Sequence, residues 1–397
     1  MIIVEAKLLH GSTYLAGEEV VCQLFFTNPS TPENSLRLSS DIETLAWSTA
    51  QIHCQCTLSN TSTVQSDLSQ GQDGFNMGVA PELTSFHPTR GERGITVMMT
   101  HPKILFCNIK LSPGEKAEYV YREKIPLANI PPTFRGGFVK YSYKLTIGTQ
   151  RPDSAVSEIK IPFRVLTVDG MKEPSAYTDK QKVLAPSNPF LASDDNSSAE
   201  HSVRDIALQL LAEQSARKRN NCYNISNLHG KVARISLPKT SYKIGEDLSC
   251  TFDFSQATVQ CLQVTVTLQS VEEVSERLKK EGERHTNTIS HSNHQEFCLH
   301  MSRANIMLPI PLHITPSFNS DFVSLKWQLH IEFVTLTTHI PDQAPAESDT
   351  ASTLWHGVTD LDTETIHWHL PLTLLSTNPL QCGIIQSVKC DDLVQLD

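Results

Sequence analysis

The sequence has 397 residues, of which 39% are hydrophobic, and this length favours two domains that each bury a core of their own. Its 43 acidic and 33 basic residues give a formal net charge of −10, which disfavours a general nucleic-acid binder because such a protein needs a basic face. No apolar run approaches the roughly 18 residues of a membrane span, and the first residues do not resemble a secretory signal, so we expect neither.

The first clear strand is predicted from Val20 to Phe26, after a turn at Gly17. Residues 14–22 read Y-x-x-G-E-E-V-x-C, and the same spacing returns at residues 242–250 as Y-x-x-G-E-D-L-x-C. A spacing that is kept in two distant segments predicts two copies of one structural unit. Acidic side chains beside a glycine in both copies indicate a turn rather than acid–base catalysis.

Several cysteines lie in segments where apolar and polar residues alternate, as in a strand with one buried face. Of the ten cysteines, five fall on the apolar side of predicted strands: Cys22, Cys54, Cys56, Cys107 and Cys250. We expect them to be small buried thiols in a reducing compartment rather than members of disulfides.

Two loops that combine arginine and glycine are the candidate protein-contact sites. Arg90 and Arg93 belong to R-G-E-R-G at residues 90–94, and Phe134 and Arg135 belong to F-R-G-G before a long strand. A guanidinium group is a rigid, permanently charged fork that suits carboxylates and backbone carbonyls. The alternative is a salt bridge that fixes the loop to the fold, and the sequence does not decide between the two.

Two long strands with one buried face give the strongest structural signal. Apolar and polar residues alternate over residues 139–147 and again over residues 323–331. Each run follows a similar P-T-F or P-S-F motif, at residues 132–134 and 316–318. A period of two places one face of each strand in a core and the other face in water.

These patterns predict an all-β protein of two tandem immunoglobulin-type sandwiches joined by a partly helical linker. Each half closes with a strand that contains a proline, Pro162 or Pro371, and we expect those strands at a sheet edge or beside a bulge. The linker carries a helix-like stretch from Val203 to Arg219. The expected ranges are 1–170 for the first sandwich, 171–222 for the linker, 223–377 for the second sandwich and 378–397 for a tail, with long loops at 59–88 and 339–350.

Sixteen histidines accompany the ten cysteines, so clusters of histidine are candidate metal sites. In a strand His53 points away from the neighbouring cysteines, and the cluster at residues 291–300 lacks the C-x-x-C pairs typical of structural zinc. His367 and His369 share one strand face, but the sequence offers no evident third ligand. We therefore predict no metal and no cofactor, and the absence of G-x-S-x-G and P-loop motifs leaves no predicted catalytic residue.

Longer segments carry a family resemblance, in the order HPKILFC at 101–107, LSPGE at 111–115, KYSYKLTIG at 140–148, APSNPFL at 185–191 and VSLKW at 323–327. In these segments the chain resembles the retrograde Golgi transport protein of the Rgp family, from its beginning to about Leu375. Two tandem sandwiches that each begin with Y-x-x-G-E and end with a proline-containing strand also resemble the arrestin fold.

The resemblance implies a non-catalytic, arrestin-like subunit of a guanine nucleotide exchange factor complex that activates a Golgi Rab GTPase in retrograde endosome-to-Golgi transport. It implies a large partner subunit of the Ric family that carries a β-propeller. It also implies a cytosolic protein that reaches the Golgi membrane peripherally, through the complex. The family supplies no contact residues to carry over, so the four candidates above rest on their own sequence context.

Exchange factors act by binding the nucleotide-free GTPase better than the nucleotide-bound form, so no covalent chemistry is needed. One hypothesis is that an exposed sheet edge accepts the flexible tail of the GTPase as an added strand. In the alternative, both sandwiches only brace the partner subunit. The competing functions are an arrestin-like cargo adaptor of the alpha-arrestin or retromer type, although the P-P-x-Y motif of alpha-arrestins is missing, and an enzyme whose site lies in the loops.

Overall fold

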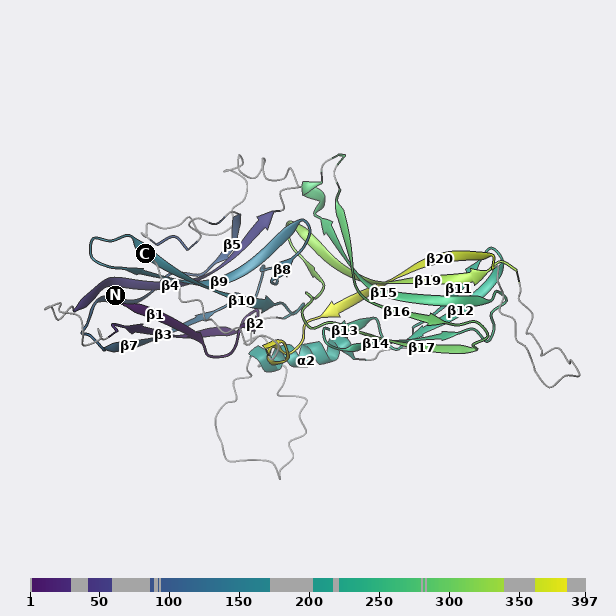
Figure 1. Ribbon diagram of the computed structural model, residues 1–397, viewed down its shortest axis with the longest axis horizontal. Helices are drawn as coiled ribbons and strands as arrows, with labels where there is room; N and C mark the ends of the chain where they lie inside the picture. Colours follow the sequence, from purple (N-terminus) through teal and green to yellow (C-terminus); the bar gives the residue numbers. More distant parts are fainter. Residues whose placement is uncertain are drawn as a thin grey trace, which may run out of the picture.

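The computed structural model describes residues 2–29, 42–58, 86–88, 92, 94–171, 203–216, 221–279, 281–282, 284–338 and 361–383. These residues form two lobes of β-sheet that lie end to end along the long axis (Figure 1). The prediction of an all-β protein is confirmed, whereas its arrestin-like and immunoglobulin-type character stays a prediction.

The N-terminal lobe contains two sheets. One has the strand order β1-β3-β7, and the other has the order β2-β10-β9-β4-β5, with β6 added to β4 and β8 added to β9. The strands are β1 (Ile3–Leu8), β2 (Thr13–Leu15), β3 (Glu19–Thr27), β4 (Glu43–Leu58), β5 (Ile95–Met99), β6 (Lys103–Leu111), β7 (Lys116–Lys124), β8 (Phe134–Arg135), β9 (Val139–Gln150) and β10 (Val156–Leu166).

The C-terminal lobe repeats this plan. Its sheets have the orders β11-β12-β14-β17 and β13-β20-β19-β15-β16, with β18 added to β19. The strands are β11 (Asn221–Asn227), β12 (Gly230–Leu237), β13 (Ser241–Lys243), β14 (Asp247–Asp253), β15 (Cys261–Val274), β16 (Thr286–Phe297), β17 (Arg303–Pro309), β18 (Phe318–Asn319), β19 (Val323–Leu336) and β20 (Thr363–Leu375). A 3-10 turn, η3 (Glu276–Leu278), lies between β15 and β16.

The duplicated sequence motifs occupy equivalent places in the two lobes. Tyr14 lies in β2, which pairs parallel with β10, and Tyr242 lies in β13, which pairs parallel with β20. Both tyrosines are buried, with exposed fractions of 0% and 1%. The P-T-F and P-S-F motifs likewise lead into β8 and β18, which pair with β9 and β19. The prediction that the chain contains the same unit twice is therefore confirmed.

In each of the two proline-containing strands, the proline lies in a part of the strand that pairs with only one neighbour. Pro162 pairs with Lys144 of β9, and β10 gains its second partner, β2, only from Arg164 onward. In the same way Pro371 pairs with β19, and β13 joins β20 only from Thr373. Proline has no N–H to donate, so each strand carries it where a second ladder is not yet formed.

The linker and tail differ from the expected ranges. Helix α2 (Val203–Ser215) ends before Arg219, and β11 already begins at Asn221, within the expected linker. The expected tail starts with a short helix, α3 (Pro379–Gly383). The expected loops lie outside the described residues, except for residues 86–88. Within the described residues, no helix is long and apolar enough to cross a membrane.

The prediction of a buried thiol is confirmed for four of the five cysteines and is wrong for Cys107, which is exposed. The reason is a break in the alternation of β6. Asn108 has a φ of 53°, in the left-handed region. The alternation that points Leu111 into the core is therefore interrupted before Cys107. The inward position is taken by Phe106 instead, which is 9% exposed.

This arrangement predicts the reactivity of the described thiols. A maleimide reagent should label Cys107 and Cys222 in the native protein, because both are exposed. Hydrogen bonds with Ser236 and Arg234 also lower the pKa of the Cys222 thiol, which favours the reactive thiolate. The seven buried thiols should react only after unfolding, as peptide mass spectrometry can check. Labelling of Cys54 or Cys250 in the native protein would contradict the burial.

Candidate functional site

The junction between the lobes is built around one buried glutamate. Glu272, on β15 of the C-terminal lobe, is 2% exposed. Its Oε2 accepts a hydrogen bond from the backbone N–H of Gly137 at 2.6 Å, and its Oε1 accepts from Phe138 at 3.0 Å and Val139 at 3.2 Å. Successive N–H groups that converge in this way form a concave anion site, and here the anion comes from the other lobe.

The two glycines of the F-R-G-G loop make this approach possible. A β-carbon on Gly136 would collide with the carboxylate of Glu272, and one on Gly137 would collide with the amide of Asn287. One of the two alternatives for this loop was that its arginine recognises a carboxylate or a backbone carbonyl. The loop does bind a carboxylate, but through its backbone N–H groups, and the carboxylate belongs to the same chain.

Aromatic rings pack beside the glutamate. Phe134 and Phe318, the last residues of the repeated P-T-F and P-S-F motifs, lie edge to face with ring centroids 5.1 Å apart. Tyr141 also packs on Phe318, and its hydroxyl lies 2.9 Å from the Oγ of Ser320. The two equivalent motifs therefore meet each other, which makes the junction an internal contact between the repeats.

The outcome for the four candidate contact residues follows from this geometry. Phe134 is 8% exposed and packs against Phe318 of the other lobe, and a contact of Phe134 with another protein stays a prediction. Arg135 is exposed, and its role as a contact for another protein stays a prediction. Arg90 and Arg93 lie outside the described residues.

Further polar contacts close the junction. The guanidinium group of Arg164 donates to the backbone oxygens of Leu312 at 3.1 Å and Ile314 at 2.7 Å. Thr315 donates its hydroxyl to the backbone oxygen of Thr133 at 3.1 Å. These bonds satisfy backbone carbonyls of both lobes within the contact, which stabilises one arrangement of the lobes.

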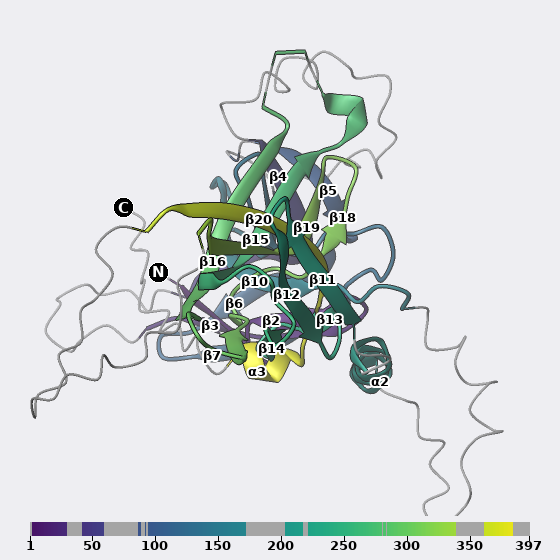
Figure 2. The ribbon, with the colours of Figure 1, turned by 90° about the vertical axis from the view of Figure 1, so that its right-hand side faces the viewer.

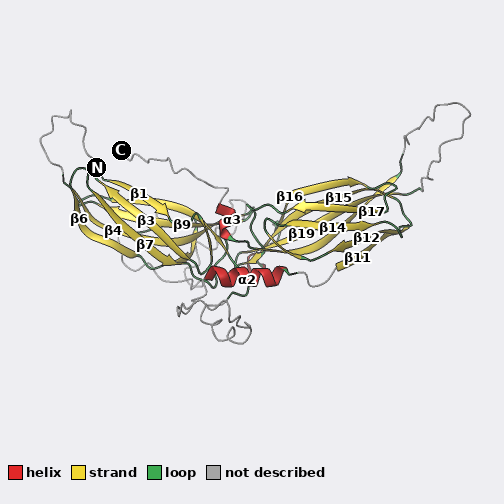
Figure 3. Ribbon diagram, turned by 90° about the horizontal axis from the view of Figure 1, so that it is seen from below, coloured by secondary structure: helices red, strands yellow, loops and turns green. Residues whose placement is uncertain are grey.

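Helix α2 connects the two equivalent Gly-Glu turns. At its N-terminal end Arg204 pairs with Glu18 of the first lobe, Nε to Oε1, at 2.6 Å. At its C-terminal end the carbonyl of Ser215 accepts a hydrogen bond from Lys239 at 3.3 Å, and Lys239 pairs with Glu246 of the second lobe at 2.7 Å. Figure 2 shows the helix outside the sheets, and Figure 3 shows it lying across the region where the lobes meet.

Both glutamates shape the turn to which they belong. Glu18 accepts from the backbone N–H of Leu15 at 2.7 Å, and Glu246 accepts from Lys243 at 3.0 Å. The prediction that these acids serve turn structure is confirmed. In addition, Glu18 binds one end of α2 directly through Arg204, and Glu246 binds Lys239, which donates to the other end.

Glu92, the acid of the second candidate loop, is held by lysines of β9 and β10. Glu92 forms ion pairs with Lys144 and Lys160, and its Oε2 lies 3.7 Å from Nε2 of the fully buried His53. Burial opposes ionisation of Glu92, but hydrogen bonds from the two lysines outweigh it and lower its pKa. The two alternatives for the arginines of this loop stay predictions, because Arg90 and Arg93 lie outside the described residues.

His53 makes the stability of this region depend on pH. Burial lowers its pKa from 6.5 to about 4; Glu92 opposes the shift, and Lys144 and Lys160 add to it. Because the folded state stays neutral while the unfolded state takes up a proton, stability is lost as pH falls from 6.5 towards 4. At pH 4.5 the loss from this group is about 2.5 kcal/mol relative to pH 7.

Between pH 7 and pH 4.5 the native chain should lose more unfolding free energy than a His53→Gln variant. The difference between the two losses should be about 2.5 kcal/mol. Urea denaturation at both pH values measures the difference. Equal losses in the two proteins would show that His53 is not the titrating group.

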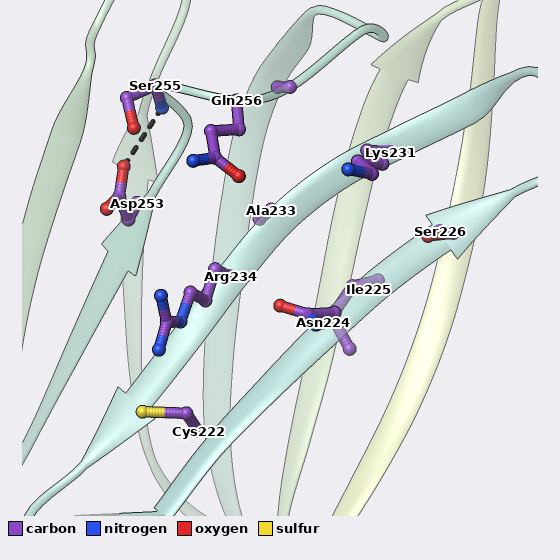
Figure 4. A pocket seen from close by; sticks show the side chains of 11 residues that line it. Cys222, Asn224, Ile225, Ser226, Lys231, Ala233, Arg234, Asp253, Ser255 and Gln256 are labelled. Atoms are coloured by element: carbon purple, nitrogen blue, oxygen red, sulfur yellow. Dashed lines mark hydrogen bonds between the residues drawn. The ribbon is translucent and has the colours of Figure 1, made fainter.

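A polar hollow lies on the C-terminal lobe, away from the junction. It is formed by β11, β12 and the segment that follows β14, and Figure 4 shows Asn224, Arg234 and Gln256 around it. Because β11 is the outermost strand of its sheet, the hollow runs beside a sheet edge that pairs with no other strand among the described residues. Such an edge can hydrogen-bond to an added extended chain.

The residues that build the junction carry little signal in the sequence, with one exception in β15. The inward face of β15 reads Val264, Val266, Leu268, Ser270 and Glu272. An acid at the end of an apolar face needs a buried partner. Nothing local in the sequence marks Arg164 or Arg204 as members of the same contact.

Comparison with known proteins gives consistent matches along both lobes. The model of the Rgp1 family matches residues 31–174 and 167–336. A Homo sapiens protein named RAB6A-GEF complex partner protein 2 is 38% identical over 384 residues, which cover 96% of each chain. A Bos taurus protein of the same name is 38% identical over 390 residues, again 96% of each chain.

Proposed function

The chain belongs to the Rgp1 family, and from this premise we propose that it is a non-catalytic subunit of a guanine nucleotide exchange factor complex for a Rab GTPase. The observation that carries the proposal is the 38% identity to the RAB6A-GEF complex partner protein 2, which extends over 96% of both chains. We further propose that the GTPase is a Golgi Rab in retrograde endosome-to-Golgi transport. The proposed subunit is arrestin-like and cytosolic, and it reaches the Golgi membrane peripherally through the complex.

The proposed partner is a large subunit of the Ric family that carries a β-propeller. Exchange requires only that the complex binds the nucleotide-free GTPase more tightly than the nucleotide-bound form. A subunit that braces such a complex needs a fixed shape rather than a reactive group. The junction supports this role. Glu272 and Arg164 connect one lobe to the other, and Arg204 connects α2 to the N-terminal lobe.

The sheet edges support a more specific contact. We propose that the flexible tail of the GTPase adds as an extended strand to a free edge of the C-terminal lobe, either β11 beside the polar hollow or β16. The net charge of −10 would attract a basic tail over about 8 Å at physiological salt. Binding that is unchanged when the tail is removed, or when proline is introduced into these edges, would exclude this contact.

Co-purification followed by an exchange assay tests the proposed function. The chain is purified from cells, and the preparation is examined for a stoichiometric β-propeller protein. Release of a fluorescent guanine nucleotide from a Golgi Rab is then measured with the pair and with each subunit alone. We expect faster release with the pair and no effect of this chain alone. A chain that purifies without such a partner, or a pair that leaves nucleotide release unchanged, would overturn the proposal.

A further inference from the structure

Three histidines and a glutamate converge on the outer face of β19 and β20. The cross-strand register places His330 opposite His369, and Glu332 opposite His367. Within each strand the two residues are two positions apart, so all four side chains leave the sheet on the same side. The sequence showed only His367 and His369, because the other two residues come from a strand more than thirty positions earlier.

The ligand atoms lie at distances suited to one metal ion. Nε2 of His330 is 2.9 Å from Oε1 of Glu332, and Nδ1 of His367 is 3.6 Å from the same oxygen. One ligand atom from each of these three residues lies within 4.8 Å of the others. In a tetrahedral zinc site with bonds of about 2.0–2.1 Å, ligand atoms are separated by about 3.3 Å. Two of the three separations already bracket that value.

His369 lies where a supporting residue is needed. Its Nε2 is 2.9 Å from Nδ1 of His330. An imidazole that binds a metal through Nε2 carries its proton on Nδ1, and in protein sites it donates that proton to an acceptor. Nε2 of His369 is placed to accept that proton, which would orient the ring of His330 and set its tautomer.

We propose that His330, Glu332 and His367 bind a divalent cation, with Zn²⁺ preferred and with His369 positioning His330. Two imidazole nitrogens and one carboxylate oxygen form a donor set that suits Zn²⁺, and water completes the tetrahedron. The site is open to solvent on one side, since the side chain of His367 is 53% exposed and that of Glu332 is 37% exposed. This inference does not depend on the proposed role in nucleotide exchange.

Metal titration of the full-length, tag-free chain tests the site. The protein is treated with a chelator and titrated with Zn²⁺ by calorimetry, and with Co²⁺ by visible absorption, which reports four-coordinate geometry. We expect one equivalent to bind in the native chain and to be lost in His367→Gln and Glu332→Gln. His369→Phe should still bind Zn²⁺, but about 10–100-fold more weakly, as expected for a supporting residue.

His294→Gln is the matched control. His294 also lies 3.2 Å from a glutamate two residues away, Glu296, on the edge strand β16. Its loss should leave both titrations unchanged. Because His367 is half-exposed, its variant should fold, and circular dichroism confirms this. The proposal is overturned if the native chain binds no more Zn²⁺ than His367→Gln, or if the Co²⁺ spectrum persists in that variant, which would place the metal on other ligands such as thiols.

Discussion

Replacing Glu272 with glutamine should lower the unfolding free energy by about 2–4 kcal/mol, one of the two largest single-residue effects that we expect. The carboxylate accepts three backbone hydrogen bonds from Gly137, Phe138 and Val139. Hydrogen bonds to a charged group contribute about 1.5–3 kcal/mol each, and a buried donor left without an acceptor costs about 1–3 kcal/mol. Glutamine keeps one oxygen but turns its NH₂ group towards a backbone N–H, so at least one donor loses its acceptor.

The neighbouring residue provides the control. Glu273 pairs with Lys326 at 2.6 Å, and the two side chains are 33% and 63% exposed. Exposed pairs contribute about 0–1 kcal/mol, so Glu273→Gln should change stability by no more than that. Both variants remove one negative charge, and they do so at adjacent positions of β15. The difference between their unfolding free energies therefore measures the effect of burial and of the three hydrogen bonds at Glu272.

Denaturant unfolding of both variants measures the change in unfolding free energy. The shape of the unfolding curve should change as well. Glu272 joins the two lobes, so its loss should separate their unfolding into two transitions while each lobe keeps its own core. If Glu272→Gln and Glu273→Gln shift the midpoint equally, the carboxylate does not hold the lobes together. If the proposed bracing role holds, Glu272→Gln should also slow nucleotide release by the assembled complex.

The sequence was sufficient for the strands and for the repeat, for a physical reason. Alternation over residues 139–147 and 323–331 reports which face of a strand is buried, and this property depends on adjacent residues only. The shared Y-x-x-G-E spacing identified Tyr14 and Tyr242 as equivalent, because a duplicated fold keeps its turns. Where the backbone left regular geometry, at Asn108, the same reasoning failed for Cys107.

The junction and the histidine cluster could not be derived in the same way. Glu272 meets Gly137 across 135 positions of sequence, so their contact depends on how two finished lobes dock. His330 meets His369 through the register of β19 and β20, and shifting that register by one residue would send the side chains to opposite faces. Long-range sites of this kind require the arrangement of strands as well as their positions.

Replacing Arg204 with methionine should destabilise the protein by about 2–4 kcal/mol, whereas Lys239→Met should cost about 1 kcal/mol or less. The two residues attach opposite ends of α2 to the two lobes. Methionine keeps most of the apolar stem of each side chain. Their partners differ in burial. The side chain of Glu18 is only 8% exposed, whereas Glu246 is 28% exposed. Removing Arg204 therefore leaves a buried carboxylate without its ion-pair partner.

A double-mutant cycle with Glu18→Gln separates the ion pair from the packing of the arginine stem. The coupling energy between Arg204 and Glu18 should exceed the coupling between Lys239 and Glu246, measured in the same way with Glu246→Gln. Limited proteolysis should cut the helix faster in Arg204→Met, since the end of α2 that faces the N-terminal lobe loses its attachment. Equal couplings at the two ends would mean that burial does not decide the strength of these attachments. The larger coupling at Glu18 would instead show that α2 is held mainly by the N-terminal lobe, and that the equivalent turn of the C-terminal lobe is the end that can release first.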